Sequence, residues 1–337
     1  MNESTPKIRI AINGFGRIGR NLFRLLLNHP AIEVVAINDI ADNRTMAHLT
    51  KYDSIHGVLG QEVSFDDHHI LVDRKKYRFY HEKEISKLNW KAENIDIVVE
   101  ATGKFKVFSD VNEHIIAGAK KVILSAPSDD DVIKTVVLGV NDQILDGTET
   151  IISNASCTTN NAAPMIKIID ELCGIEQAYI TTVHSYTTDQ SLHDQPHKDL
   201  RRARGAAQSI VPTTTGAAKA LTKIFPEMEG KIGGSGIRVP VPDGSLTDIT
   251  CYVKCETSAD DINKAFKEAS AQHLRGIIDY TEDPIVSVDV IGNRHSCLFD
   301  AQLTSVIGRM VKVVGWYDNE IGYASRIIDL ITLVGTK

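Results

Sequence analysis

The fold of the amino-terminal half is decided by one segment, IAINGFGRIGR at residues 10–20. The apolar run from Lys7 to Asn13 is typical of a buried strand, and the run from Arg17 to Asn28 is typical of a helix. The glycines between them follow the spacing G-x-G-x-x-G. Gly14 permits a tight turn, Gly16 lets a ligand approach the backbone, and Gly19 lets helix and strand pack closely. The segment therefore predicts a strand–turn–helix unit whose helix start presents free N–H groups to an anion.

The alternation of strand and helix continues beyond this segment. Runs rich in Val and Ile predict buried strands at Glu33–Asn38, Ile95–Glu100 and Lys121–Ser125, with a helix at Val107–Ala117. A more polar, alternating stretch from Val63 to Tyr80 predicts inserted antiparallel strands. We therefore expect an α/β domain of the Rossmann type, with a mainly parallel sheet covered by helices on both faces.

An acidic residue stands where a domain of this type binds a ribose. Asp39 follows Gly19 by 20 residues, at the end of the second predicted strand. Its carboxylate can accept hydrogen bonds from both hydroxyls of an adenine ribose and would repel a 2′-phosphate, so the sequence predicts NAD rather than NADP. Residues 101–103 and 125–127 follow later strands and are expected at the edge of the same crevice. The alternative is a glycine-rich turn with a chance surface aspartate.

The second half has a different pattern. Alternating strands are predicted at Gln177–His184, Ile232–Val239, Thr247–Cys255 and Met310–Tyr317. One clear helix, at residues 259–273, follows Ser258, which is a predicted N-cap. Strands and helices in this mixed order predict an α+β domain with a mainly antiparallel sheet.

Length and composition limit the classes of function. A chain of 337 residues is long for one core, so we expect two domains: residues 1–156 joined by a final helix at 321–337, and residues 157–320. The formal charge of -7 argues against nucleic acid or a membrane surface as a partner. There is neither an apolar run that could span a bilayer nor a signal peptide, so a cytoplasmic location is expected. The five scattered cysteines predict neither a disulfide framework nor a metal site.

A reactive thiol is predicted in the second half. Cys157 stands among hydroxyl and amide side chains in Ser153–Asn160, before a helix predicted at Asn161–Leu172. The dipole and the free amides at a helix start lower the pKa of a thiol. His184, at the end of a predicted strand, is the best candidate for a base beside it. The alternative is a cysteine buried as a small apolar side chain, with a structural histidine.

Basic and hydroxyl side chains gather in the same half. The segment Lys198–Arg204 holds three arginines, and planar guanidinium groups suit phosphate. Thr213–Gly216 adds hydroxyls and a glycine that permits close approach. Arg238 lies in an otherwise apolar strand, where it is costly unless an anion or a carboxylate pairs with it. These residues predict an anion site, and the alternative is a solvated basic loop.

Together these segments resemble the glyceraldehyde-3-phosphate dehydrogenase family in its phosphorylating, NAD-dependent, glycolytic form. The resemblance covers the whole chain and is carried by Ile12–Arg20, Ser153–Asn160, His184–Thr187, His197–Arg204, Pro212–Ala220 and Trp316–Glu320. It implies oxidation of D-glyceraldehyde 3-phosphate to 1,3-bisphosphoglycerate with inorganic phosphate and NAD, through a cysteine thiohemiacetal and thioester. It also implies a homotetramer.

The resemblance implies roles for individual residues. Cys157 would be the nucleophile and His184 the base that activates it. The residues implied to contact NAD are Gly14, Gly16, Arg17, Ile18, Asp39, Lys83, Ser125, Tyr317 and Asn319. The residues implied to bind the substrate phosphate and inorganic phosphate are Ser156, Thr158, Thr187, Arg202, Thr215, Gly216 and Arg238.

Three positions depart from the common pattern of this family. Asn161 stands where many members carry a second cysteine, and Gln195 stands where NAD-specific members often have Leu. The segment Asp243–Ser245 replaces a more usual Asn-Val-Ser. The nearest rival interpretation is an erythrose-4-phosphate dehydrogenase. The sequence also allows a non-phosphorylating aldehyde dehydrogenase, or a non-catalytic NAD-binding protein that uses Cys157 as a redox sensor.

Overall fold

The structure is a computed structural model that describes residues 6–335. It divides into two compact units. The first unit contains the chain up to Val136, residues 143–155 and the chain from Ala324 onward, and the second contains residues 137–142 and 156–323. Across the described residues, no helix combines the length and the apolar character needed to cross a membrane.

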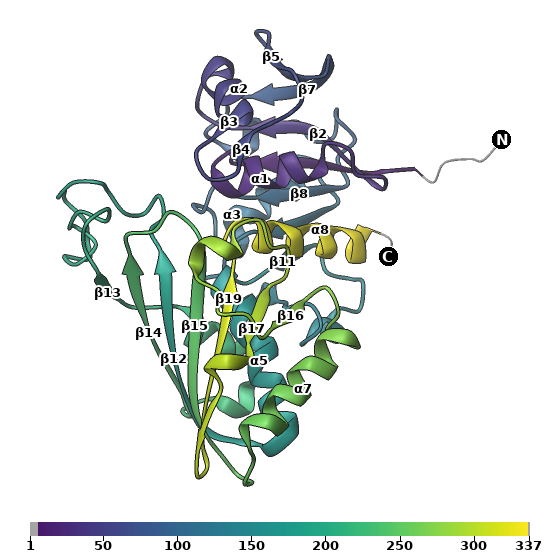
Figure 1. Ribbon diagram of the computed structural model, residues 1–337. Helices are drawn as coiled ribbons and strands as arrows, with labels where there is room; N and C mark the ends of the chain where they lie inside the picture. The colour runs from purple at the N-terminus through teal and green to yellow at the C-terminus, as the bar shows by residue number, and fades with distance from the viewer. Residues whose placement is uncertain (1–5, 336–337) are drawn as a thin grey trace. The chain divides into compact units, whose positions relative to one another are not determined.

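The first unit is built on a nine-stranded sheet with the strand order β10-β11-β9-β8-β1-β2-β7-β6-β5 (Figure 1). All neighbours from β10 to β7 pair in parallel, whereas β5, β6 and β7 pair antiparallel to one another. This confirms the predicted parallel sheet with an antiparallel insertion. The strands are β1 Ile8–Asn13, β2 Ile32–Asn38, β5 Val63–Phe65, β6 His69–Val72, β7 Lys75–Tyr80, β8 Ile97–Glu100, β9 Lys121–Leu124, β10 Lys134–Thr135 and β11 Ile151–Ser153.

Helices and a small hairpin complete the first unit. Three of the helices differ from the sequence predictions. The predicted helix at 107–117 is two short helices that meet at Asn112, and the unpredicted helix α2 begins behind Asp42, whose side chain accepts the N–H of Thr45. The elements are α1 Arg17–Leu26, α2 Asn43–Lys51, β3 Tyr52–Asp53, β4 Gly57–Val58, η1 Ile85–Lys87, α3 Phe108–Val111 and α4 Glu113–Ile116. Two further elements belong to this unit in part: η2 Asp142–Ile144 from residue 143, and α8 Ile321–Gly335 from Ala324.

Buried aromatic side chains hold the glycine turn of the first unit in place. Phe15 lies inside the turn and is fully buried. Its ring makes edge contacts with Phe23 of α1 and Phe79 of β7, and Phe23 contacts Tyr77. Because these rings belong to the turn, the helix and a strand of the sheet, their packing orients the start of α1 relative to the strand ends.

The second unit contains an eight-stranded sheet with the order β13-β14-β12-β15-β19-β17-β16, and β18 pairs with β19. Most neighbours pair antiparallel, as predicted; β12 with β14 and β16 with β17 are the parallel pairs. The strands are β12 Ile175–Ser185, β13 Val211–Thr213, β14 Ile232–Val239, β15 Ser245–Val253, β16 Ile278–Thr281, β17 Cys297–Asp300, β18 Ser305–Ile307 and β19 Met310–Tyr317.

Helices α5 and α7 lie on one face of this sheet (Figure 1). Ser258 caps α7 by accepting the N–H of Asp261, which confirms its predicted role. Helix α5 begins at Cys157, four residues before the predicted start at Asn161, because Ser156 caps it by accepting the N–H of Thr159 at 3.1 Å. The helices are α5 Cys157–Cys173, α6 Ala217–Ile224, α7 Ala259–Ala271, η3 Pro226–Met228, η4 Ser287–Val290 and η5 Ala301–Leu303.

Candidate functional site

The three glycines of the turn after β1 each have the surroundings that their spacing predicts. Gly14 has φ +95°, and a Cβ there would lie 2.5 Å from the backbone nitrogen of Thr102. A Cβ on Gly19 would collide with the carbonyl oxygen of Gly14, whereas a Cβ on Gly16 would meet nothing within 4 Å. Gly14 and Gly19 are therefore required by packing, and Gly16 leaves open space beside the N terminus of α1.

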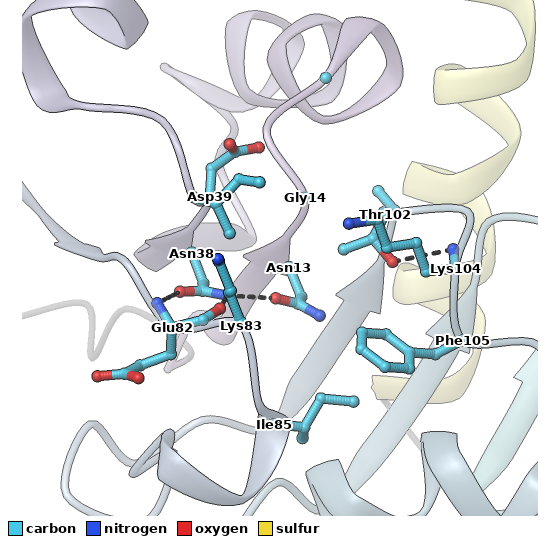
Figure 2. Close-up of a pocket in the computed structure, with 13 residues that line it drawn as sticks. Asn13, Gly14, Asn38, Asp39, Glu82, Lys83, Ile85, Thr102, Lys104 and Phe105 are labelled. Atoms are coloured by element: carbon cyan, nitrogen blue, oxygen red, sulfur yellow. Dashed lines mark hydrogen bonds between the residues drawn. The ribbon is translucent and has the colours of Figure 1, made fainter. Parts of the chain in front are cut away.

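A cavity of about 510 Å³ opens in the first unit at the carboxyl ends of its parallel strands (Figure 2). Predicted cofactor contacts lie in its wall, among them Asp39 and Lys83. The remaining wall combines polar side chains with the apolar Ile85 and Phe105, which suits a ligand with an aromatic base and polar sugars. The lining residues are Asn13, Gly14, Gly16, Asn38, Asp39, Ile40, Glu82, Lys83, Ile85, Ala101, Thr102, Lys104 and Phe105.

Asp39 links the end of β2 to the glycine turn. Its Oδ2 accepts the N–H of Phe15 at 2.7 Å, and its Oδ1 accepts the N–H of Ala41 at 3.0 Å. The side chain stays partly exposed, so each oxygen keeps a lone pair that can face a ribose hydroxyl. The carboxylate thus has a structural contact in addition to its predicted contact with the cofactor.

The other predicted cofactor contacts of the first unit lie at the same edge. The Arg17 side chain pairs with Asp53 through two hydrogen bonds, of 2.5 and 3.1 Å. Burial acts to raise the pKa of Asp53, but Arg17 and two backbone N–H groups lower it to about 2. Ile18 lies in the first turn of α1, and Ser125 follows β9, where its N–H bonds the carbonyl of Glu100. Arg17 and Ile18 can therefore offer backbone N–H groups to an anion, while the Arg17 guanidinium is engaged.

In the second unit, Cys157 lies beside His184. The two residues are 27 apart in sequence, and the distance between Cys157 Sγ and His184 Nε2 is 3.5 Å. Cys157 is the first residue of α5 and is partly exposed, whereas His184, near the end of β12, is buried. The residue before the N-cap, Ala155, has φ +55°, a conformation that non-glycine residues seldom adopt. This turn aims the thiol at the imidazole.

The pKa values of this pair differ from the sequence expectation. Burial raises the pKa of Cys157, and the charge of Arg238 and the N–H of Thr158 offset this only in part. The expected lowering of the pKa of Cys157 is therefore wrong, because desolvation outweighs the helix start. Burial and the charge of Arg238 lower the pKa of His184 to about 3. The imidazole is thus neutral at neutral pH and able to accept a proton.

The tautomer of His184 follows from its neighbours. Nδ1 lies 2.8 Å from the carbonyl oxygen of Ser185 and 2.7 Å from Arg238 Nη1, which donates to the same carbonyl at 2.9 Å. Nδ1 cannot donate to Ser185 and accept from Arg238 at once. A carbonyl has two lone pairs and can accept from both groups, so the Nδ1–H tautomer satisfies both donors. The lone pair of the ring is then on Nε2, facing the thiol.

Two predicted cofactor contacts of the second unit are held by hydroxyl groups. Asn319 Oδ1 accepts from Ser185 Oγ at 2.8 Å and from Ser245 Oγ at 2.7 Å, so its amide nitrogen is the atom that can donate to another group. The Tyr317 hydroxyl lies 2.9 Å from Thr158 Oγ1 and 3.0 Å from Thr182 Oγ1, and its ring packs edge-on against His184. Tyr317 therefore supports the imidazole from within the unit.

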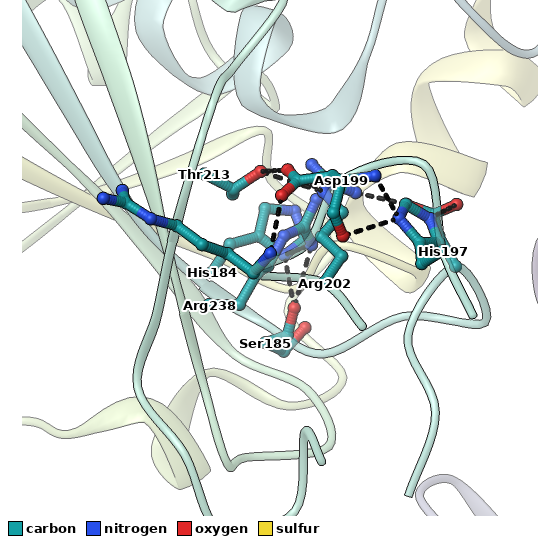
Figure 3. Close-up of polar contacts among 9 residues, drawn as sticks. His184, Ser185, His197, Asp199, Arg202, Thr213 and Arg238 are labelled. Atoms are coloured by element: carbon teal, nitrogen blue, oxygen red, sulfur yellow. Dashed lines mark hydrogen bonds and ion pairs between the residues drawn. The ribbon is translucent and has the colours of Figure 1, made fainter. Parts of the chain in front are cut away.

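Charged side chains gather next to His184 (Figure 3). Arg202 pairs with Asp189, and its Nε donates to Thr213 Oγ1 at 2.9 Å. The charge of Arg202 lowers the pKa of Arg238, after burial, which places the two guanidinium groups within electrostatic reach of each other. Two neighbouring like charges are stabilised by an anion between them, so this cluster is suited to bind phosphate.

The remaining predicted anion ligands are placed as follows. Ser156 caps α5, and Thr215 accepts the N–H of Ala217 at the start of α6. Gly216 is the N-cap of α6, and a Cβ there would meet nothing within 4 Å. Thr187 follows β12, and its carbonyl accepts the N–H of Gln190. The Thr158 hydroxyl bonds Tyr317 in the interior, which was not predicted.

Several residues that shape the two sites were missed by the sequence reasoning. Asn13, Asn38 and Glu100 support the cavity of the first unit, and Asp189 and Ser245 support the second site. One sequence signal was available: Glu100 is a charged residue at the end of an otherwise apolar strand. The amide and hydroxyl residues carry no comparable signal, because such side chains are common in loops.

The two sites define a class of protein. A glycine turn with an acidic residue at the end of the next strand is the arrangement of a dinucleotide-binding domain. A thiol beside a neutral imidazole, with arginines nearby, is the arrangement of covalent cysteine chemistry on an anionic substrate. Fold and sites together are those of a nucleotide-dependent oxidoreductase.

Comparisons with known proteins identify the family. Residues 8–107 match the NAD binding domain of glyceraldehyde 3-phosphate dehydrogenase, and residues 156–319 match its C-terminal domain. The chain is 51% identical over 333 residues to glyceraldehyde-3-phosphate dehydrogenase 2 of Streptomyces avermitilis, covering 98% of this chain and 99% of the relative. It is 48% identical over 332 residues to glyceraldehyde-3-phosphate dehydrogenase 1 of Bacillus subtilis, with the same coverage. Identity to the Mycobacterium avium glyceraldehyde-3-phosphate dehydrogenase is 52% over 335 residues, covering 97% and 98%. The chain belongs to the glyceraldehyde-3-phosphate dehydrogenase family, and its cofactor is NAD.

Proposed function

We propose that this protein oxidises D-glyceraldehyde 3-phosphate to 1,3-bisphosphoglycerate, with inorganic phosphate as the second substrate and NAD as the acceptor. The observation that carries the proposal is the 3.5 Å contact of Cys157 Sγ with His184 Nε2, beside two arginines. Family membership supports the same reaction. A role in glycolysis and gluconeogenesis and a cytoplasmic location follow from the proposal.

The first step is the attack of Cys157 on the aldehyde carbon. A bond forms between Sγ and this carbon, and His184 Nε2 passes the thiol proton to the former carbonyl oxygen, which gives a thiohemiacetal. His184 returns to its neutral form in this step. The low pKa of His184, about 3, makes the imidazole available as a base at neutral pH.

The second step oxidises the thiohemiacetal. The cofactor supplies the hydride acceptor when it is bound. His184 removes the proton of the hydroxyl as the hydride leaves the carbon, and the product on Cys157 is a thioester. Inorganic phosphate then attacks the thioester carbonyl, the C–S bond breaks, and sulfur takes up the proton that His184 had removed, so that both groups return to their starting forms.

Arginines and hydroxyls of the second unit would hold the two phosphate groups. We assign Thr187, Arg202 and Arg238 to these anions, with Ser156, Thr158, Thr215 and Gly216 at neighbouring positions. The charge of Arg202, which lowers the pKa of Arg238, supports this assignment. An anion bound there would offset the charge that lowers the pKa of His184, and would therefore make the imidazole a stronger base when substrate is present.

We assign to NAD residues whose surroundings fit one part of the cofactor. The open space beside Gly16 fits a pyrophosphate, and the partly exposed Asp39 fits a ribose. Asn319, whose amide oxygen is engaged, fits a donor to the nicotinamide carboxamide. The further contacts that we propose are Gly14, Arg17, Ile18, Lys83, Ser125 and Tyr317.

The domain division and the assembly are part of the same proposal. We assign NAD binding to residues 1–156 together with residues 321–337, and catalysis to residues 157–320; residues 1–5 and 336–337 lie outside the described residues. We also propose a homotetramer. The sheet of the second unit leaves Tyr179 and Tyr252 about half exposed, at 52% and 50%, which suits contact with another copy. Light scattering coupled to size-exclusion chromatography tests the mass of the assembly.

The experiment that tests the function is NADH formation from glyceraldehyde 3-phosphate, with and without inorganic phosphate. Rapid turnover that requires both NAD and phosphate is expected. Repeating the assay with erythrose 4-phosphate and with NADP tests the nearest rival and the role of Asp39. Faster turnover of erythrose 4-phosphate, or turnover without phosphate, would contradict the proposal.

A further inference from the structure

A buried carboxylate lies below the dinucleotide cavity. Glu100 is the last residue of β8, and its side chain is fully buried. Its Oε1 accepts the N–H of Thr102 at 2.8 Å and also the Thr102 hydroxyl. Its Oε2 lies 2.5 Å from Asn13 Nδ2 and 3.1 Å from His114 Nε2. The proposed reaction uses neither Glu100 nor His114, and a buried carboxylate is costly unless hydrogen bonds compensate it, so this cluster requires a reason of its own.

One end of the network is fixed by an indole. Trp90 Nε1 lies 2.9 Å from His114 Nδ1, and both side chains are fully buried. An indole N–H can only donate, so His114 Nδ1 carries the lone pair. The proton of the neutral ring is then on Nε2, which donates to Glu100.

The other end is fixed by the backbone. The N–H of Glu82 donates to Asn38 Oδ1 at 2.8 Å, and Asn38 Nδ2 donates to the carbonyl of Glu82 at 2.9 Å (Figure 2). Asn38 Nδ2 also donates to Asn13 Oδ1 at 2.7 Å. Neither amide can be reversed, because the backbone groups of Glu82 fix the first one. Asn13 must therefore present its Nδ2 to Glu100.

The hydrogen bonds of Asn13, His114 and Thr102 consequently all point at Glu100. The fixed donors are Trp90 Nε1–H, the N–H of Glu82 and the N–H of Thr102. Both oxygens of Glu100 must accept, and only a carboxylate offers two accepting oxygens at this position. A glutamine of the same shape would place its NH₂ group opposite the donor of either Asn13 or Thr102. Two buried donors would then face each other, and neither would have an acceptor.

The network joins the strand ends that surround the cavity. Asn13 ends β1, Asn38 ends β2, and Thr102 follows β8, and all three line the cavity. Thr102 also packs on the glycine turn, since a Cβ on Gly14 would lie 2.5 Å from its nitrogen. A displacement of Thr102 is therefore transmitted to the turn that offers its N–H groups to the pyrophosphate.

We propose that Glu100 and His114 are positioning residues for the dinucleotide, which act by holding Asn13 and Thr102 at the cavity floor. The role rests on the NAD binding of this chain, and it is separate from the chemistry at Cys157. Loss of the network should weaken NAD binding and leave the turnover at saturating NAD largely unchanged.

The test uses the full-length Glu100→Gln variant, with NAD affinity measured by calorimetry. We expect the Kd for NAD to rise by about tenfold, while kcat at saturating NAD stays within about twofold. The matched control is Glu149→Gln. Glu149 is nearly buried in the same unit and accepts hydrogen bonds from Lys134 and two backbone N–H groups. It precedes β11, which lies two strands away from β8 in the sheet. Its variant should lose thermal stability with an unchanged Kd.

A pair of variants at His114 separates hydrogen bonding from packing. His114→Gln keeps one donor and one acceptor and should retain most of the NAD affinity, whereas His114→Leu keeps neither and should match Glu100→Gln. Unchanged NAD affinity in folded Glu100→Gln would overturn the proposal, as would equal losses in His114→Gln and His114→Leu. Because NAD affinity is measured directly, absence of glyceraldehyde 3-phosphate oxidation in the parent protein would refute the proposed function without touching this test.

Discussion

The floor of the dinucleotide cavity and the surroundings of the thiol are both polar and largely buried, yet they are held together differently. At the floor, neutral donors with fixed directions converge on one acceptor, Glu100. Around the thiol, like charges lie close together, and Arg202 and Arg238 each lower the pKa of a neighbour. The first arrangement is complete within the protein, whereas we propose that the second is completed by an anion of the substrate. The difference teaches that a binding floor can be rigid while a reaction site keeps charge ready for its substrate.

The largest expected effect removes the thiol and tests the independence of the two regions. Cys157→Ser should lower turnover by several orders of magnitude, because a hydroxyl is a much weaker nucleophile than a thiol. NAD affinity should remain, since Cys157 is not among the residues assigned to NAD and does not line the cavity. Single-turnover kinetics and calorimetry measure both quantities. Near-normal turnover would contradict the assignment of the nucleophile.

The next effect removes one of the neighbouring charges. Arg238→Met should raise the pKa of His184 from about 3, because the guanidinium lowers it. It should also raise the pKa of Cys157, because the same charge lowers that pKa. We expect slower alkylation of Cys157 at neutral pH and a loss of about a hundredfold in kcat/KM. The exposed Arg201→Met is the control. An unchanged pH profile of alkylation in Arg238→Met would contradict the electrostatic role of Arg238.

The third prediction compares two variants of the glycine turn. Gly14→Ala should lower the melting temperature strongly, because its Cβ would collide with Thr102 and because φ is +95°. Gly16→Ala should fold normally, since its Cβ meets nothing, but should weaken NAD binding by about tenfold by filling the space proposed for the pyrophosphate. Thermal melts with calorimetry measure both. Equal stability losses in the two variants would contradict this division of roles.

The smallest expected effect concerns the pH dependence of stability. Burial, followed by the charges of Asp318 and Glu320, raises the pKa of Asp243 to about 8. The folded protein then holds a proton that the unfolded chain releases above its ordinary pKa near 3.8, so stability should fall as pH rises from about 4 to 8. Asp243→Asn should remove this slope and be more stable at pH 8 by about 1 kcal/mol or more. Urea titrations at a series of pH values measure this, and parallel curves for the two proteins would contradict it.

The sequence predicts the two sites unequally, for a physical reason. The glycine turn, Asp39 and the parallel strands could be predicted because they lie in one local segment with a fixed spacing. The early start of α5 was missed because residues 157–160 are polar and lack helical periodicity, and the helix begins there through the Ser156 cap.

Contacts between distant residues could not be predicted in the same way. The contact of Cys157 with His184 depends on the packing of α5 near β12, and the sequence supplied only the two side chains. The partners of Glu100 come from three separate segments, and their hydrogen-bond directions depend on backbone groups that no residue pattern reports. The pKa of Cys157 was predicted in the wrong direction because burial is a property of the folded unit.

The last helix has a consequence for synthesis. Helix α8 ends at Gly335, and its residues from Ala324 onward belong to the first unit, where a Cβ on Gly335 would lie 2.5 Å from Ile8. Ile327, Leu330 and Ile331 of this helix are buried. The second unit precedes these residues in the chain, so this helix can pack on the first unit only after the second unit has been translated. The first unit therefore gains its final packing late, and deletion of the buried residues of this helix should destabilise it.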